Sequence, residues 1–551
     1  KILALVAWTI MTSLRFKLLL LILLASSQAF AVDKVIDGGA GTDSLVINYS
    51  GISSLGDFAI SESGDYIVLT ASNGDTIQFK NIENLTVGSI AYTATGTATS
   101  GYNVVNGYVN TSERTLYLYP GSNATSASTA SAHQFEQIFG TKTSCVTGDY
   151  TITGSTGVET LNLNVSSRTG SSTSECFTGG WIIDLKSGDD VINSAKLIND
   201  DSIDMGSGDD SISVMFGADA GGFQTIANAS LAKLDGGAGQ DTIRYDESTN
   251  TSGTISLTTS GATNFENIVG SPGAETITGD TNANYLAGGS YSSSSTVADI
   301  LNGGDGNDML LASYNGSGIG SDVFGFVKTY WPYANNYTTE GTFRNGSSTY
   351  FSSGGNHTLN GGSGDDIIFG AEGEDTLDGG KGQDNLIGGK GIDTFVIRAG
   401  DGSTSLTDAD VIQDFKDGTD LIGMSGLQFS DLTIAQGTGN YSNLILISIT
   451  SSGEYMAVIH TQGQNGAGTI SASDITALDF VSTSTADQTI NGTTGNDTLI
   501  GGSGADTFNT NAGTDSIYAH GGNDTINVNG VGSKVIDGGA GTDSLVINYS
   551  G

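Results

Sequence analysis

Four aspartates in the middle of the chain recur at intervals of nine residues: Asp366, Asp375, Asp384 and Asp393. Each belongs to a unit of the form G-G-x-G-x-D-x-U-x, where U is a large apolar residue. Glycines at the first, second and fourth positions permit positive φ and a tight turn with exposed carbonyl groups. A file of carboxylates beside turn carbonyls is an oxygen cage of the kind that Ca²⁺ prefers.

The same unit occurs elsewhere in the chain. A second array begins at residue 492, and shorter arrays lie within 185–213, 236–244 and 294–311. One degenerate unit, at 352–360, has a histidine where the aspartate belongs. The aspartates at the acidic position are the candidate metal ligands: Asp190, Asp201, Asp210, Asp241, Asp299, Asp308, Asp366, Asp375, Asp384, Asp393, Asp497, Asp506, Asp515, Asp524 and Asp543.

The ligand types discriminate between metals. Ca²⁺ takes about six to eight oxygen ligands, whereas Mg²⁺ demands a tighter octahedron and retains its waters. Zn²⁺ prefers His or Cys, and the 4 histidines of the chain are scattered. Without an ion the carboxylates repel one another, so the free energy of binding becomes free energy of folding. We therefore expect multiple Ca²⁺ ions as cofactors.

Short strands must position these carboxylates. The x-U-x half of each unit is extended with U pointing inward, and two units make one circuit of a flattened helix, so that aspartates of successive circuits stack. Alternating segments between the arrays predict further strands. The expected fold class is all-β, with parallel β-roll or β-solenoid arrays interspersed with β-rich segments.

The patterns predict eight segments along the chain. They are upstream residues plus a signal peptide at 1–31, an N-terminal rung at 32–51, a β-rich segment at 52–180, an irregular β-roll at 181–311, an aromatic insertion at 312–351, the main β-roll at 352–425, a β-rich connecting segment at 426–482 and a C-terminal β-roll at 483–551.

The predicted signal peptide begins at Met11, where basic residues precede an apolar run and a small-x-small cleavage motif ends at Ala31. The run is too short for a stable membrane anchor. We expect a secreted chain, extracellular or at the cell surface, without membrane insertion after cleavage. In such a chain Cys145 and Cys176 are expected to form a disulfide.

The net charge is −40, from 59 acidic and 19 basic residues. This charge repels nucleic acids and anionic lipids, so neither is an expected partner. A solvated acidic surface of the kind found in halophiles is the alternative explanation. The regular spacing of the acids favours cation binding instead.

Residues 34–51 and 534–551 are identical over all 18 positions. Other units of the chain diverge from one another, so the identity predicts tandem units of 500 residues. The alternatives are an artefact of sequence assembly, or a head-to-tail junction by which the sequence represents a filament.

The nonapeptides resemble the RTX, or haemolysin-type calcium-binding, repeat family, most strongly over 352–397 and 483–551. The resemblance implies a parallel β-roll in which the aspartates at the acidic position bind Ca²⁺ through their side chains, with turn carbonyls completing each site. Residues 408–427 also resemble the segment that closes such rolls. The predicted signal peptide is a departure, because many members of the family lack one.

No catalytic motif accompanies the repeats, since neither HExxH nor GxSxG is found. We therefore expect no enzyme but a calcium-binding structural protein that assembles with itself, as a homopolymer or as tandem units, into a filament, sheath or surface layer. The alternative is a calcium-dependent adhesin that binds glycans, including a surface polysaccharide, or host surfaces. It rests on Trp331 and the tyrosines around it, because aromatic faces bind sugars.

Overall fold

The computed structural model describes residues 19–20, 34–95, 107–110, 115–118, 150–162, 181–195, 201–214, 234–245, 253–256, 262–271, 273–289, 297–312, 344–345, 348–349, 355–460 and 469–548. The Cys145–Cys176 disulfide, Trp331 and the signal peptide apart from residues 19–20 lie outside these ranges and stay predictions. Within the ranges, every regular element is a β-strand or a single 3-10 turn.

The chain forms two compact units, of which the first comprises 1–214, 229–241 and 261–264. Its largest sheet has the order β1 (Leu19–Leu20), β3 (Ser44–Ile47), β7 (Asn84–Val87), β8 (Ile90–Thr95), β9 (Gly107–Asn110), β10 (Thr115–Leu118), β11 (Tyr150–Thr153), β13 (Trp181–Asp184), β15 (Ser202–Asp204), β17 (Leu234–Asp235) and β20 (Ala262–Thr263). A second sheet has the order β2 (Lys34–Asp37), β6 (Thr76–Lys80), β5 (Tyr66–Ala71) and β4 (Phe58–Ser63), with η1 (Leu55–Asp57) before β4. Parallel pairing also joins β12 (Thr160–Asn162), β14 (Val191–Ala195) and β16 (Ser211–Val214).

The second unit contains two long columns of strands. One runs β19 (Gly253–Ser256), β22 (Glu275–Thr278), β24 (Ile300–Asp305), β28 (Thr358–Ser363), β30 (Thr376–Lys381), β32 (Thr394–Arg398), β34 (Leu421–Ser425) and β38 (Phe480–Ser482). The other runs β18 (Thr242–Tyr245), β21 (Asn267–Val269), β23 (Tyr285–Ala287), β25 (Met309–Leu311), β29 (Ile367–Phe369), β31 (Asn385–Ile387), β33 (Asp410–Ile412), β37 (Tyr455–His460), β36 (Leu444–Ile449) and β35 (Leu432–Gln436).

The same unit ends in a further roll, with β39 (Thr489–Asn491), β41 (Thr507–Thr510), β43 (Thr525–Val528) and β45 (Ser544–Ile547) in one sheet and β40 (Thr498–Ile500), β42 (Asp515–Tyr518) and β44 (Lys534–Asp537) in the other. The remaining elements are the hairpin β26 (Arg344–Asn345) and β27 (Ser348–Thr349), and the turns η3 (Leu406–Asp408), η4 (Phe429–Asp431), η5 (Gly439–Tyr441) and η7 (Ala477–Asp479).

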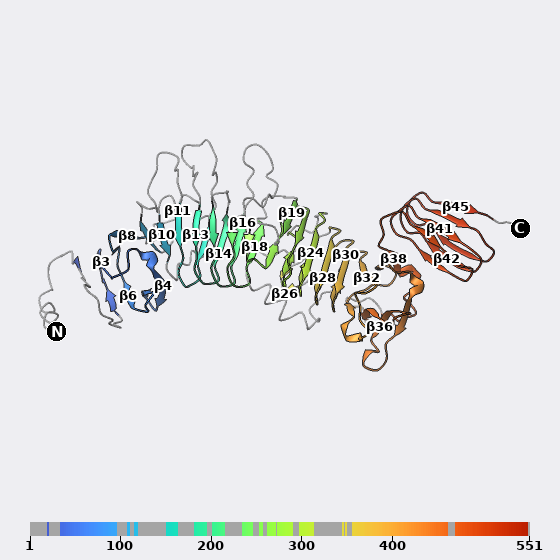
Figure 1. Cartoon of the computed structure of the whole chain (residues 1–551), viewed down its shortest axis with the longest axis horizontal. Helices are drawn as coiled ribbons and strands as arrows, with labels where there is room; N and C mark the ends of the chain where they lie inside the picture. The colour runs from blue at the N-terminus through green and yellow to red at the C-terminus, as the bar shows by residue number, and fades with distance from the viewer. Residues whose placement is uncertain are drawn as a thin grey trace, which may run out of the picture. The chain divides into compact units, whose positions relative to one another are not determined.

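The strand register follows the period of the sequence. Leu359 of β28 pairs with Leu377 of β30, which pairs with Phe395 of β32, each in parallel and eighteen residues further along the chain. Figure 1 shows these strands stacked as successive rungs. Two nonapeptides therefore make one circuit, and the prediction of a parallel β-roll is confirmed.

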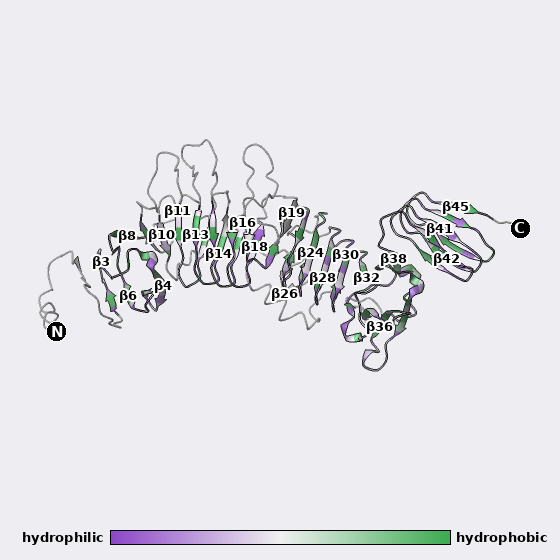
Figure 2. Ribbon diagram, viewed as in Figure 1, coloured by the Kyte–Doolittle hydropathy of each residue, from purple (hydrophilic) through white to green (hydrophobic). Residues whose placement is uncertain are grey.

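The core of the roll is a narrow column of the inward U residues. Leu359, Ile368, Leu377, Leu386 and Phe395 are all buried, and Figure 2 shows hydrophobic and hydrophilic residues alternating along the strands. Burying one such side chain contributes about 1.5–3 kcal/mol. Because each strand offers one or two of these residues, the core is thin and the turns must contribute to stability.

Close stacking of the turns requires glycine at the fourth position of each unit. Gly373 has a φ of +146°, and a Cβ added there would lie 1.9 Å from the carbonyl oxygen of Gly355. No side chain fits between two carbonyl-bearing turns at that separation. The glycine pattern thus fixes the spacing that brings the acidic residues into line.

Candidate calcium-binding ladders

Chains of hydrogen bonds link the aspartates of the second unit from circuit to circuit. The Oδ1 atom of Asp384 accepts the backbone N–H of Asp366 at 2.8 Å, and the Oδ1 atom of Asp393 accepts that of Asp375 at 3.0 Å. We call the two series the aspartate ladders. The first comprises Asn284, Asp308, Asp366, Asp384 and Asp410; the second comprises Glu275, Asp299, His357, Asp375, Asp393 and Asp420.

The second carboxylate oxygen of a ladder aspartate faces its own glycine turn. A Cβ on Gly361 would lie 2.2 Å from Oδ2 of Asp366 and 2.6 Å from the carbonyl oxygen of Gly379. Glycine therefore leaves this space to converging oxygen atoms. The buried Oδ2 atom accepts no hydrogen bond in Asp308, Asp366, Asp375 and Asp384. An unsatisfied buried acceptor costs about 1–3 kcal/mol, and more when it is charged.

Burial also shifts the protonation equilibria of the ladders. Desolvation raises the pKa of Asp366 to about 8 and that of Asp375 to about 9. The pKa of Asp393 is raised to about 8 for the same reason, with Asp420 as a nearby like charge. In the metal-free protein these carboxyls therefore hold protons near neutral pH. A bound cation must displace those protons.

The C-terminal roll shows what such a cation would contact, because a lysine ammonium group occupies one turn. Lys534 Nζ lies 2.7 Å from Oδ2 of Asp515, and it donates hydrogen bonds to the carbonyl oxygens of Asn511 and Gly513 at 2.9 and 2.8 Å. Only 6% of the Lys534 side chain is exposed. One carboxylate oxygen and the carbonyls of the second and fourth turn positions thus form a cation-binding set of oxygen atoms.

The other predicted residues of this roll use their carboxylates in two ways. Asp497 and Asp506 use Oδ2 to accept backbone N–H groups of their own turns, from Thr493 and Gly502. Asp524 keeps a buried Oδ2 without a hydrogen bond, and its N–H donates to Oδ1 of Asp543 at 3.0 Å. The turns of this roll therefore differ in how much of their carboxylate remains for a metal.

The first unit contains a shorter ladder. Oδ1 of Asp210 accepts the N–H of Asp190 at 2.6 Å, and Oδ1 of Asp241 accepts the N–H of Asp210 at 2.8 Å. The fourth predicted residue, Asp201, lies apart from this series and accepts the N–H of Trp181 at 2.8 Å. Desolvation raises the pKa of Asp190 to about 8.

Side chains alone do not assemble a metal site in the part of the chain that the structure describes, where no three His, Cys, Asp or Glu side chains form such a group. Each Ca²⁺ would need carbonyl oxygens as well, as the Lys534 contacts illustrate. All-oxygen ligands of this kind fit Ca²⁺ and not Zn²⁺. The described residues thus fit calcium, and the assignment of individual ligands stays a prediction.

Several ladder members were not predicted from sequence. Asp410 and Asp420 continue the two ladders beyond the array by accepting the N–H groups of Asp384 and Asp393. Nine-residue spacing stops before them, so the period could not find them. The resemblance of 408–427 to a closing segment was the available signal.

At some ladder positions another residue stands in place of aspartate and still makes the hydrogen bonds between circuits. Neutral His357 accepts the N–H of Asp299 through Nδ1 at 3.0 Å, and burial lowers its pKa to about 4. Glu159 and Glu275 occupy the acidic position in irregular rungs, where Ser155 and Ser271 donate hydrogen bonds to them. A glutamate with a serine four residues earlier is the sequence signal for such rungs.

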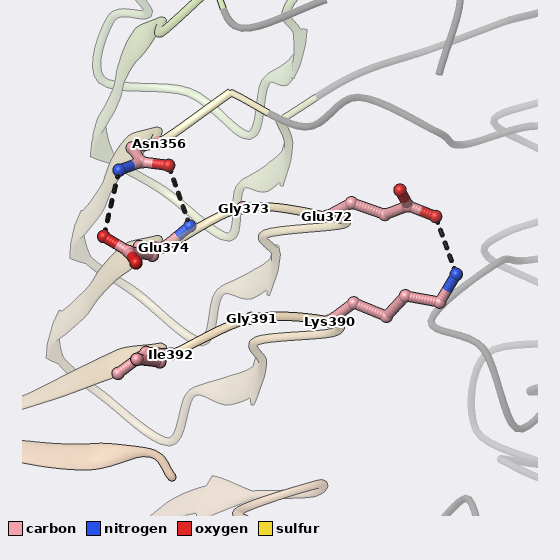
Figure 3. A pocket seen from close by; sticks show the side chains of 7 residues that line it. All are labelled: Asn356, Glu372, Gly373, Glu374, Lys390, Gly391 and Ile392. Carbon is pink, nitrogen blue, oxygen red and sulfur yellow. Dashed lines mark hydrogen bonds and ion pairs between the residues drawn. The ribbon is translucent and has the colours of Figure 1, made fainter. Parts of the chain in front are cut away.

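The outer face of the turns carries a second, exposed series of contacts. Figure 3 shows Asn356 paired with Glu374, whose N–H donates to Asn356 Oδ1 at 3.0 Å, and Lys390 Nζ 2.8 Å from Glu372. These residues line a shallow depression with Gly373, Gly391 and Ile392. Their side chains bond to one another from rung to rung, which stabilises the stack but offers no buried acid or base for catalysis.

Comparisons with known proteins agree with this geometry. A sequence model of the RTX calcium-binding nonapeptide repeat matches residues 298–313, 351–395, 484–517 and 491–526. A search of curated proteins found no match. In the described residues, none of the helical turns has the length and apolarity needed to cross a membrane. The chain therefore contains RTX nonapeptide repeats, a β-roll unit that binds Ca²⁺ at multiple sites.

Proposed function

We propose that this protein is a secreted, calcium-stabilised structural protein that assembles into an extracellular filament, sheath or surface layer. Calcium binding is supported by one observation above all: successive rungs of the ladders contain a buried Oδ2 atom that accepts no hydrogen bond. The RTX repeat is itself a calcium-binding unit and not a catalytic one. A stack of rungs that bound cations hold together would resist unfolding, as a filament, sheath or surface layer outside the cell requires.

The residues of the ladders define how calcium would act. Asp366 and Asp384 would supply carboxylate oxygens, and the neighbouring turns would supply carbonyl oxygens. Bound Ca²⁺ would neutralise these oxygens and join adjacent rungs. The Oδ1 hydrogen bonds orient each carboxylate beforehand, since Oδ1 accepts an N–H group of the preceding circuit while Oδ2 faces the turn.

The test is assembly of the purified, signal-free chain in excess Ca²⁺, measured by light scattering coupled to gel filtration and by electron microscopy. We expect high-molecular-mass polymers that dissolve on adding EDTA. A chain that binds Ca²⁺ yet stays monomeric at all concentrations would contradict the structural role. Glycan binding by that monomer, lost on replacing Trp331, would instead support the adhesin alternative.

A further inference from the structure

A cleft of about 490 Å³ lies where the connecting segment meets the first rung of the C-terminal roll. One wall comes from residues in and beside η4, and the other comes from β39, β40 and the turn between them. Small-molecule sites commonly have a volume of roughly 300–1,000 Å³. None of the described lining residues belongs to the two aspartate ladders, so the cleft has a chemistry of its own.

Ring packing and hydrogen bonds hold the two walls together. Phe429 of η4 packs edge-to-face against the buried Phe480, with ring centroids 5.0 Å apart. The N–H of Ser482, in the same strand as Phe480, donates to the carbonyl oxygen of Gly501 in the roll at 2.9 Å. Gln488 Nε2 donates to the Ser482 hydroxyl at 3.1 Å. The cleft is therefore formed before a ligand arrives, which lowers the entropy cost of binding.

The lining of the cleft is polar but almost uncharged. It consists of side-chain amides, hydroxyl groups and apolar side chains, with Asp497 as the one ionisable residue among the described lining residues. Both oxygens of Asp497 are already used by Thr493, whose N–H and hydroxyl donate to Oδ2 and Oδ1 at 2.7 and 2.9 Å. Amides and hydroxyls both donate and accept hydrogen bonds. This combination suits a ligand that is rich in hydroxyl groups and carries no formal charge.

A column of amides leads away from the cleft along the outer face of the roll. Asn491 lines the cleft, and its Oδ1 atom accepts a hydrogen bond from Asn509 Nδ2 at 2.8 Å. Asn509 Oδ1 in turn accepts from Asn527 Nδ2 at 3.0 Å. Because both bonds run in one direction, the Nδ2 group of Asn491 keeps its two N–H donors for a ligand, as far as the described residues show.

A column of threonines runs beside these amides. Thr489, Thr507 and Thr525 pair in parallel register, each two residues before an asparagine of the first column. The residue between them in each strand, such as Phe508, is buried, so the threonines and asparagines face outward. Successive rungs of a sheet lie about 4.8 Å apart. The face therefore repeats the same neutral donors and acceptors at a short, constant interval.

The main roll has a similar column but a different face. Asn360 Nδ2 donates to Asn302 Oδ1 at 2.7 Å, which matches the amide bonds of the C-terminal roll. The next residue in that column is Asp378, which forms an ion pair of 2.5 Å with Arg398. An uncharged column beside a cleft thus distinguishes the C-terminal roll from the main roll, and Asn360 offers a matched control.

We propose that this cleft and the Thr/Asn face next to it bind a neutral, linear polysaccharide. One sugar ring would lie against Phe429, because aromatic faces bind the apolar faces of sugars. Further sugars would extend along the face, where their hydroxyl groups meet the asparagine and threonine side chains.

The charge and the position of the polar groups select this ligand class. An acidic polysaccharide is disfavoured, because none of the described lining residues is basic and the chain has a net charge of −40. A peptide that adds to a sheet uses a backbone edge, whereas the groups here are side chains on a sheet face. The inference goes beyond the proposed structural role, since saccharide binding does not require self-assembly.

Isothermal titration calorimetry on the full, signal-free chain in Ca²⁺ measures binding, with cellohexaose, chitohexaose and maltohexaose as probes. At least one of these neutral hexasaccharides should bind. An oligogalacturonate of the same length, which is acidic, should bind at least tenfold more weakly. Failure of all three neutral probes, or a preference for the acidic one, would overturn the proposal.

Substitutions locate the site. Phe429→Ala, and the double variant Thr489→Val with Asn491→Ala, should each weaken binding of the same probe at least tenfold. Asn360→Ala removes an equivalent amide from the main roll and should leave the affinity unchanged. No ladder aspartate is altered, so an unchanged Ca²⁺ stoichiometry reports that each variant is folded. Equal losses in the cleft variants and in Asn360→Ala, or a loss on Trp331→Ala alone, would place the ligand elsewhere and overturn the proposal.

Hydrogen exchange of the unaltered chain gives a readout that needs no substitution. The bound hexasaccharide should protect peptides from 428–432 and 488–499, whereas peptides from 358–363 in the main roll should exchange as before. Protection elsewhere without protection of the first two segments would contradict the assignment. A Gly/Ser peptide that protects those segments better than any hexasaccharide would also contradict it, because the cleft would then be a peptide site.

Discussion

Replacing Lys534 by methionine should convert a calcium-independent turn into a calcium site. The substitution removes the ammonium group that lies 2.7 Å from Oδ2 of Asp515, a side chain with no exposed surface. Removing one partner of a buried ion pair costs about 3–5 kcal/mol, because the remaining charge is uncompensated. In EDTA we therefore expect the rungs around β42 and β44 to open roughly 10²-fold to 4 × 10³-fold more often, at about 1.4 kcal/mol per tenfold change.

Hydrogen exchange followed by mass spectrometry measures this opening on the full chain. Peptides from 507–548 should exchange faster in the variant in EDTA and recover most of their protection in Ca²⁺, while calorimetry should count one more Ca²⁺. The double variant Lys534→Met with Asp515→Asn is the control, because it removes the charge and should gain no calcium. Unchanged exchange of the single variant in EDTA, or an unchanged calcium count, would refute the reasoning.

Three further outcomes follow from the ladders. Asp384→Asn should lower the Ca²⁺ stoichiometry measured by calorimetry by at least one, whereas Asp365→Asn, on the exposed outer face, should leave it unchanged. Gly373→Ala should destabilise the roll by at least about 1–3 kcal/mol, because of backbone strain. Gly418→Ala is the control, since a Cβ at Gly418 meets nothing within 4 Å, and it should lower the melting temperature less. Burial raises the pKa of carboxyls such as Asp366, to about 8. The metal-free chain should therefore lose stability as the pH rises from about 4 through 8, whereas the calcium-loaded chain should gain stability over the same range. Chemical denaturation of both forms measures the two trends.

The repeat period was enough to predict the roll and the acidic columns. Leu359, Leu377 and Phe395 pair eighteen residues apart, as two nonapeptides per circuit require, because a period repeated without interruption leaves one way to stack the apolar residues. The buried positions of Asp366 and Asp384 follow from the same repeat.

The sequence pattern could not show how each carboxylate is used. Lys534 stands nineteen residues after Asp515, and only the stacked structure places its ammonium group in that turn. Asp410 and Asp420 were missed because the chain between the last repeat and these residues is not nine residues long. A residue belongs to a ladder because of its place in the stack of circuits. An irregular loop can bring a residue to that place at any spacing along the sequence.

The central claim is that calcium held between stacked rungs stabilises this chain, and thermal unfolding in calcium and in chelator tests it most directly. A site filled at a hundred times its dissociation constant adds about 2.7 kcal/mol, so several sites should raise the melting temperature strongly in excess Ca²⁺ relative to EDTA. The same concentration of Mg²⁺ should have a much smaller effect. Superimposable melting curves in Ca²⁺ and EDTA would contradict the account.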